Sequence, residues 1–175
     1  MAFNDMIAAV EGYRHYAQKK SNAHFRMSER ARARHNAFGI PVTVSTAIVG
    51  TTIFATLNSP TQSLWIQVPA GLLSLFAAVL AALQTFFNFS DIAAQHKDAA
   101  VNYEAVRHKL DLFLLSYGPW KDTVTLEQPL KDFDAITKQL DDITRKAPSV
   151  PDSVYDAAQT RVAEIPILRS EPRET

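Results

Sequence analysis

Residues 64–89 read LWIQVPAGLLSLFAAVLAALQTFFNF, and this stretch decides the fold. It carries no Lys, Arg, Asp or Glu, and it lies within a longer uncharged interval at residues 36–90. Such an interval, about 55 residues long, is unusual in a chain that elsewhere has a charge at about every third or fourth position. It has room for two membrane-spanning helices, because about 20 apolar residues cross a hydrocarbon core about 30 Å thick.

The interval divides into two apolar segments with a short turn between them. Residues 38–57 form the first predicted span, residues 64–89 form the second, and residues 58–63, NSPTQS, have the Pro and Ser content of an outer turn. The positive-inside rule places both chain ends in the cytoplasm, because the flanks of the spans carry Lys and Arg and the turn carries none. The basic residues nearest the first span are Arg26, Arg30, Arg32 and Arg34.

The charged segments on either side of this interval predict a cytoplasmic helical bundle. Residues 1–36 form a basic helix, and the second span continues as one uninterrupted helix to about residue 117, where Gly118 and Pro119 end it. An amphipathic helix follows at residues 121–146, and residues 161–175 have the composition of a disordered tail. We therefore expect an all-α membrane protein, with residues 1–160 forming one domain that consists of a two-transmembrane-helix hairpin and a bundle of the N- and C-terminal helices. The alternative is a soluble bundle with two buried central helices, which spans of this length disfavour.

The composition excludes several kinds of chemistry. The chain has no cysteine, so thiol catalysis and Cys-ligated zinc are excluded, and its 18 basic and 18 acidic residues give no net charge to attract nucleic acid. No glycine-rich phosphate loop or nucleophile elbow is present. His96, Glu104 and His108 share helical spacing, but the stripe drifts too far around the helix for all three to ligate one ion. We expect no metal, no cofactor, no direct nucleic-acid binding and no enzymatic activity.

Polar residues inside the predicted spans are the main candidates for function. The first span carries Thr43, Thr46 and Thr51, whose hydroxyls can bond back to a helix carbonyl. The second carries Gln84 and Asn88, one turn apart, and an amide that faces lipid leaves its donors without partners. These five residues therefore either line a watery path or form interhelical contacts. A single hairpin cannot enclose water, so a path requires a homo-oligomer, which the small residues of both spans would permit.

The junction between membrane and cytoplasm carries a resemblance to a known family. The order of basic helix, GIPVTVSTAIVGTTIFATL, short turn, GLLSLFAAVLAALQTFFNFSDIAAQHKDAAVNYEAVRHKLD and a closing APSVPDSVY resembles the SLATT family. Members of that family are two-transmembrane effector domains associated with SMODS nucleotidyltransferases and SLOG proteins in bacterial conflict systems. The best markers are Leu80, Leu83, Gln84, Thr85, Phe86 and Phe87, followed by His96, Ala99, Ala100 and Tyr103.

The resemblance implies an inner-membrane effector that forms a pore or disrupts the membrane during phage infection and causes growth arrest or cell death. Its signal would be a nucleotide or a partner, such as a separately encoded nucleotidyltransferase, SLOG protein or reverse transcriptase. Phe87, Ser90, His96 and Tyr103 are then candidates for the junction that couples the bundle to the spans. The alternative function is a non-conducting membrane anchor or scaffold that recruits a cytoplasmic enzyme.

Overall fold

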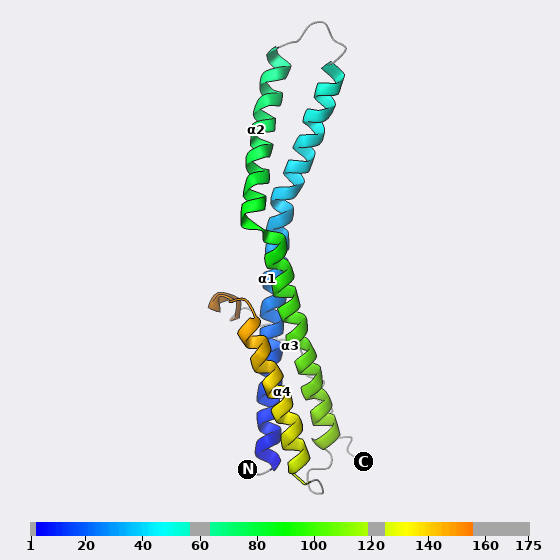
Figure 1. Cartoon of the computed structure of the whole chain (residues 1–175), viewed down its shortest axis with the longest axis vertical. Helices are drawn as coiled ribbons and strands as arrows, with labels where there is room; N and C mark the ends of the chain where they lie inside the picture. Colours follow the sequence, from blue (N-terminus) through cyan, green and yellow to red (C-terminus); the bar gives the residue numbers. More distant parts are fainter. Residues whose placement is uncertain (1–2, 57–63, 119–124, 156–175) are drawn as a thin grey trace, which may run out of the picture. The chain divides into compact units, whose positions relative to one another are not determined.

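The computed structural model describes residues 3–56, 64–118 and 125–155, and this described part contains four long helices and no strand. The helices are α1 (Phe3–Thr56), α2 (Leu64–Phe87), α3 (Phe89–Tyr117) and α4 (Glu127–Lys146), as drawn in Figure 1. The all-α class predicted from the sequence is confirmed. The predicted outer turn at residues 58–63 and the predicted tail at residues 161–175 lie outside the described residues.

The chain divides into two compact units, which we call the terminal unit and the central unit. The terminal unit comprises residues 1–28 and 94–175, and the central unit comprises residues 29–93. Helix α1 therefore contributes its first half to the terminal unit and its second half to the central unit. Helix α3 begins in the central unit and continues into the terminal unit.

The terminal unit is a bundle of three helical segments with an apolar core. Met6, Val10 and Ala17 of α1 are fully buried and belong to one cluster with α3 and α4. The members from the other two helices are Tyr103, Val106, Leu110, Phe113 and Leu140. Their spacing of three and four residues places them on one face of each helix, so the core follows directly from the sequence pattern. Helix α4 ends at the predicted residue but begins at Glu127, later than the predicted residue 121.

The continuous helix that we predicted across the end of the second span is interrupted at one residue. Asn88 separates α2 from α3 and has a φ of 42°, in the left-handed region. Its backbone N–H still reaches the Gln84 carbonyl at 3.2 Å, and its own carbonyl accepts from Asp91 and Ile92. The prediction was wrong here because no Gly or Pro marks the break. Asn is one of the few residues other than Gly that adopts this conformation readily.

Helix α1, by contrast, passes through a proline without interruption. The predicted basic helix and the first predicted span are parts of this single helix, which has Pro41 in its interior. A proline removes one backbone hydrogen bond and disfavours a helix in water, but prolines are tolerated in membrane-spanning helices, where neighbouring groups satisfy the freed carbonyl.

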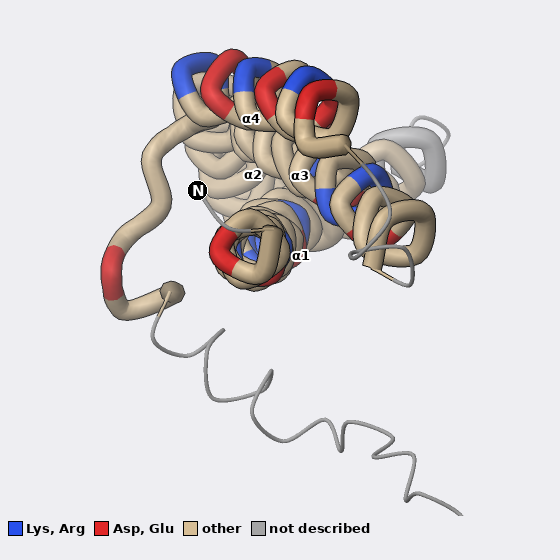
Figure 2. Tube along the Cα trace, turned by 90° about the horizontal axis from the view of Figure 1, so that it is seen from below, with Lys and Arg blue, Asp and Glu red and all other residues tan. Residues whose placement is uncertain are grey.

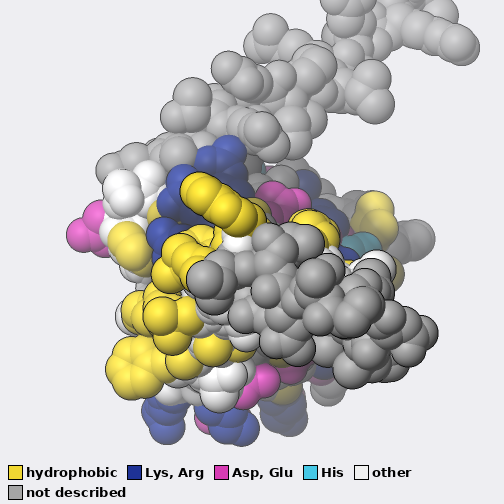
Figure 3. Space-filling model, turned by 90° about the horizontal axis from the view of Figure 1, so that it is seen from above, with side chains coloured by type: hydrophobic (Ala, Val, Ile, Leu, Met, Phe, Trp, Pro, Cys, Tyr) yellow, Lys and Arg dark blue, Asp and Glu magenta, His cyan; other side chains and the backbone are white. Residues whose placement is uncertain are grey.

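The central unit turns large apolar side chains outward. Leu72, Leu75, Phe76 and Phe86 of α2 are all more than half exposed, and so is Ile40 of α1. Among the described residues, one stretch, Val68–Tyr117, which includes most of α2 and all of α3, is long and apolar enough to cross a membrane, and few residues of its most apolar part are buried. Seen from above, hydrophobic side chains (yellow) gather on one side of the visible surface, with Lys and Arg (dark blue) next to them (Figure 3).

Candidate functional site

Gln84 lies on the side of α2 that faces α1 within the central unit. Its Nε2 is 3.4 Å from Nδ1 of His35, a long hydrogen-bond distance. A Cβ built on Gly39 would lie only 3.2 Å from the same Nε2. The absence of a side chain at Gly39 therefore makes room for the Gln84 amide, which makes an interhelical contact in this conformation.

Small and polar side chains form a groove between α1 and α2 within the central unit. The groove has a volume of about 430 Å³ and includes Thr46 and Gly50 of α1. The other lining residues are Val42, Val49, Ser74, Ala77, Ala78 and Ala81. Two of the lining residues, Thr46 and Ser74, are polar and the others are apolar, whereas large apolar side chains such as Leu72 and Leu75 are exposed.

The three predicted threonines have intrahelical partners. Thr43 donates its hydroxyl to the Gly39 carbonyl at 3.0 Å, and Thr46 donates to Val42 at 2.8 Å. Thr51 donates to Ala47 at 2.8 Å. Each bond spans four residues of α1, which is how Ser and Thr satisfy their hydroxyls in apolar surroundings. Each hydroxyl oxygen can still accept a hydrogen bond from a neighbouring group.

Asn88 does not share a stripe with Gln84. The helix interruption gives Asn88 its own backbone conformation, its side chain is exposed, and its amide donates to the Asp91 carboxylate at the start of α3. The sequence predicted that Gln84 and Asn88 face the same way because they are one turn apart in a continuous helix. The positive φ of Asn88 interrupts that helix, so the prediction no longer applies.

The basic residues before the first span are divided between the two units. Arg26 is half-buried in the terminal unit, and Arg30, Arg32 and Arg34 are exposed in the central unit. Three exposed guanidinium groups within five residues can contact lipid phosphates if the helix enters a membrane at this level.

Aromatic rings surround the helix interruption in the central unit. Phe87 and Phe89 have ring centroids 5.4 Å apart, and Phe89 stacks on Phe38 of α1 with centroids 5.7 Å apart. Phe86 contacts the edge of Phe87. Ser90, the other predicted junction residue at this level, is exposed. The aromatic contacts tie α1 to both sides of the break at Asn88.

The other two predicted junction residues, His96 and Tyr103, belong to a buried polar cluster in the terminal unit. Nδ1 of His96 lies 3.0 Å from Nδ1 of His24, a distance at which one neutral ring donates to the other. Both rings are buried. Tyr103 stacks on His24 with centroids 5.5 Å apart and donates its hydroxyl to Thr144 of α4 at 3.2 Å. The cluster therefore connects α1, α3 and α4.

Burial keeps the two histidines neutral. Desolvation, together with the positive charges of His96 and Lys20 when they are present, lowers the pKa of His24 from 6.5 to about 4. Desolvation also lowers the pKa of His96. Since two charged rings at this distance would repel each other, the contact between α1 and α3 requires at least one of the two rings to be neutral.

Lys20 joins the same region to the end of the described chain. Its Nζ donates to the Tyr155 hydroxyl at 2.9 Å and lies 4.3 Å from the centroid of that ring. Val154 is buried against Ala23. The chain after α4 is thus held against α1 by a cation–π contact, a hydrogen bond and a small apolar cluster.

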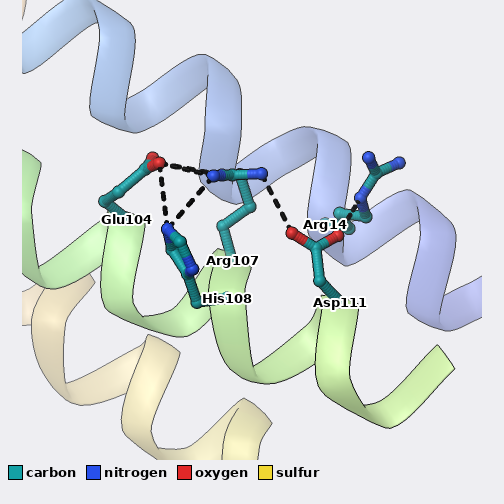
Figure 4. A network of polar contacts seen from close by, with 5 residues as sticks. All are labelled: Arg14, Glu104, Arg107, His108 and Asp111. Atoms are coloured by element: carbon teal, nitrogen blue, oxygen red, sulfur yellow. Dashed lines mark hydrogen bonds and ion pairs between the residues drawn. The ribbon is translucent and has the colours of Figure 1, made fainter. Parts of the chain in front are cut away.

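An ion-pair network around Arg107 lies at another part of the α1–α3 contact in the terminal unit. Arg107 donates to Glu104 at 2.6 Å and to Asp111 at 2.9 Å, and Asp111 also accepts from Arg14 of α1. Figure 4 shows Arg14 reaching Asp111 from the neighbouring helix, with His108 beside Glu104. Hydrogen bonding from Arg107 lowers the pKa of Glu104. The hydrogen bonds from Arg107 keep the Glu104 carboxylate ionised, and the Arg14–Asp111 ion pair connects α1 to α3.

The sequence analysis did not single out His24, Lys20 or Tyr155. One signal for His24 was present, because it follows the buried Ala17 by seven residues and so continues the apolar stripe of α1. No comparable signal was present for Lys20 and Tyr155, whose contact joins positions 135 residues apart.

Comparison with known proteins gives one match. The model of the SMODS and SLOG-associating 2TM effector domain family 4, a SLATT family, matches residues 5–165. No curated protein and no solved structure matches the chain.

Proposed function

Because the chain belongs to the SMODS and SLOG-associating 2TM effector domain family 4, we propose that it is a membrane effector of a bacterial conflict system. It oligomerises in the inner membrane and forms a pore or disrupts the bilayer when a nucleotide or a partner signals infection. The 2TM description and the apolar helical stretch together indicate a membrane protein, and the family is one of effector domains. The result of activation is growth arrest or cell death.

The proposed topology has spans at residues 38–57 and 64–89, with both termini in the cytoplasm. The absence of charge from residues 36–90 supports the spans, and the exposed Arg30, Arg32 and Arg34 support a cytoplasmic position for the start of the first one. The outward apolar side chains of α2 would then contact lipid. The terminal unit is the cytoplasmic bundle of this topology.

One observation carries the proposal of a pore: the Gln84 amide and a groove that includes Thr46 and Ser74 lie between the helices of the central unit, while large apolar side chains such as Leu72 and Leu75 are exposed. The Gln84 amide on Gly39 and the groove beside Thr46 are the parts of the helix pair that water could enter. In this account the contact of Gln84 with His35 belongs to the closed state. Rearrangement of α1 against α2 in an oligomer frees the amide to line a path.

The signal is proposed to reach the spans through the two helices that both units share. Phe87 and Ser90 lie beside the Asn88 interruption, and His96 and Tyr103 lie in the buried cluster of the terminal unit. The expected source of the signal is a separately encoded nucleotidyltransferase, SLOG protein or reverse transcriptase, in keeping with the family's association with SMODS and SLOG. The direct partners of the chain are lipid and further copies of itself.

A second candidate function is a non-conducting anchor that recruits a cytoplasmic enzyme. The observation that favours it is the satisfaction of the polar groups: Gln84 contacts His35 and Gly39, and the three threonines bond to their own helix. Under this alternative the groove between the helices serves packing alone.

Membrane potential in bacterial cells that express the full chain separates the two functions. The pore proposal predicts depolarisation by the natural sequence and loss of depolarisation in Gln84→Leu at equal expression. Thr85→Val is the matched control, because Thr85 is exposed next to Gln84 and bonds only to its own helix at Ala81 among the contacts described. If Gln84→Leu depolarised cells as strongly as the natural sequence does, Gln84 would not line the path. An intact potential with the natural sequence would favour the anchor.

A further inference from the structure

The outward face of α3 in the terminal unit carries apolar residues in heptad spacing. Val101, Leu112 and Leu115 are 51%, 62% and 72% exposed. With Ala105 and His108, which are also exposed, they recur at alternating intervals of four and three residues. We call Val101, Ala105, His108, Leu112 and Leu115 the seam. It lies opposite the buried face of the same helix, which contains Tyr103, Val106 and Leu110.

The neighbouring helix α4 shows what an exposed face of this bundle otherwise looks like. Its outer positions carry the ion pairs Glu127–Lys131 at 2.7 Å and Asp134–Lys138 at 2.6 Å. Figure 2 shows Lys and Arg (blue) alternating with Asp and Glu (red) along α4. An apolar seam on α3 beside such a charged helix indicates that α3 has a partner.

The spacing and the flanking charges specify that partner. Alternating intervals of three and four residues match the contact face of another helix, as in a coiled coil. Glu104 and Asp111 flank the seam on one side and Lys109 flanks it on the other, as their helical positions require. If two copies of α3 run parallel and in register, Glu104 of one lies next to Lys109 of the other, five residues further on. An antiparallel pair would instead bring Glu104 near Asp111, two carboxylates that Arg107 already pairs within each chain, and would leave Lys109 away from Glu104.

We propose that the seam of α3 is the surface on which a second copy of this chain docks, in parallel and in register. This inference rests on the proposed function, because insertion into one membrane is what gives all copies the same orientation. Only two heptads are present, so the seam is too short to hold two free helices together. Confinement of the copies to a membrane supplies the high effective concentration that a short seam needs. Lys109 is exposed and donates to Gln139 at 2.6 Å. In the docked pair it donates instead to Glu104 of the neighbouring copy.

The absence of natural cysteines makes disulfide cross-linking a direct test. Val101→Cys, Leu112→Cys and Leu115→Cys are made singly in the full chain and oxidised in intact membranes with copper phenanthroline. Ala135→Cys on the exposed face of α4 is the matched control. We expect a dimer band several-fold stronger for each seam variant than for the control. Co-expression of Val101→Cys with a tagged Leu115→Cys should give no mixed dimer, because these positions face each other only in an antiparallel pair.

Two further variants test the chemistry of the seam in the Val101→Cys background. Leu112→Glu places a charge in the seam at an exposed position and should reduce cross-linking several-fold without loss of expression. His108→Leu removes the polar residue from the seam and should increase it. Equal cross-linking in Ala135→Cys, a mixed dimer of Val101 and Leu115 variants, or adducts with another protein in place of dimers would overturn the proposal.

The same samples separate this inference from the pore. Dimers at the seam without depolarisation would support the docking surface and contradict the pore. Depolarisation without seam dimers would keep the pore and overturn the docking surface.

Discussion

Asn88 shows how one side chain can have a different role from the one that its surroundings suggest. An amide at the end of an apolar helix is costly if it faces lipid, and the sequence pattern therefore favoured a place beside Gln84. The φ of 42° gives another reason for an Asn at this position, because Asn adopts left-handed backbone more readily than any apolar residue. The residue allows the chain to change direction between α2 and α3, and its amide holds Asp91 of the following turn.

Substitutions at Asn88 should therefore follow backbone preference. Asn88→Gly retains the left-handed conformation and should change the free energy of unfolding little, whereas Asn88→Val should lower it by about 1–2 kcal/mol. Thermal unfolding of the full chain in detergent micelles, followed by circular dichroism, measures the difference. Equal stability of the two variants would show that the positive φ is not required in solution.

Gly39 provides a second test at the scale of one residue, because the Gln84 amide occupies the space next to it. In an ordinary helix position, Gly→Ala stabilises by roughly 0.5–1 kcal/mol. A Cβ at Gly39 would meet Gln84 Nε2 at 3.2 Å, whereas a Cβ at Gly50 would meet nothing within 4 Å. Gly50 is therefore the matched control.

We expect Gly50→Ala to gain this stability and Gly39→Ala to lose most or all of the gain, as measured by unfolding in micelles. In a Gln84→Ala background the two glycine substitutions should become equivalent, because the amide that obstructs Gly39 is gone. A difference that persists in that background would mean that Gln84 does not lie on Gly39.

At the scale of helices, the spacing of apolar residues was sufficient to predict most of the bundle. The buried residues Met6, Val10, Leu110 and Leu140 lie on the faces that three-and-four spacing assigns to the core. The end of α3 at Tyr117 follows from Gly118 and Pro119, whose turn preferences are strong. These features depend on local pattern, which a single sequence contains.

The features that the sequence could not supply depend on contacts between distant segments or on one backbone angle. The pairing of His24 with His96 and of Lys20 with Tyr155 follows from the register of packed helices, which apolar spacing does not specify. The break at Asn88 follows from a single φ value in a run that contains no Gly or Pro. Gln84 was singled out from the sequence as an unusual residue in an apolar helix, but its contact with Gly39 needed the position of α1 against α2.

The His24–His96 contact makes the stability of the α1–α3 pair depend on pH. The pKa of His24 is lowered to about 4 in the folded chain, from an ordinary value of 6.5. The unfolded chain therefore binds more protons between these values, and stability falls as the pH drops from about 6.5 towards about 4. A shift of this size corresponds to a loss of up to about 3 kcal/mol.

Unfolding of the full chain in micelles at pH 7.5 and at pH 5 tests this dependence. The natural sequence should be less stable at pH 5, and His24→Gln should lose part of that difference because it cannot be protonated. His15→Gln, at an exposed position of the same helix, is the control and should behave as the natural sequence does. If His24→Gln keeps the full difference, another group with a lowered pKa, such as His96, accounts for the pH dependence instead.

At the scale of the whole molecule, the chain combines two units that follow opposite rules of burial. Apart from the seam of α3, the terminal unit buries most of its large apolar side chains around Tyr103 and Leu110, as a domain in water does. The central unit exposes Leu72, Leu75 and Phe76, as a helix pair in lipid does. Helices α1 and α3 are shared by both, so that a rearrangement of the first unit can act on the second along continuous backbone.

The central claim, that copies of this chain open a path through a membrane, is tested most directly by dye release from liposomes that contain the purified full chain. We expect the natural protein to release a trapped fluorescent dye and Gln84→Leu to release several-fold less. Thr85→Val should behave as the natural protein does. Liposomes that retain their dye at every protein density, although the protein is inserted in one orientation and forms dimers at the seam, would contradict it.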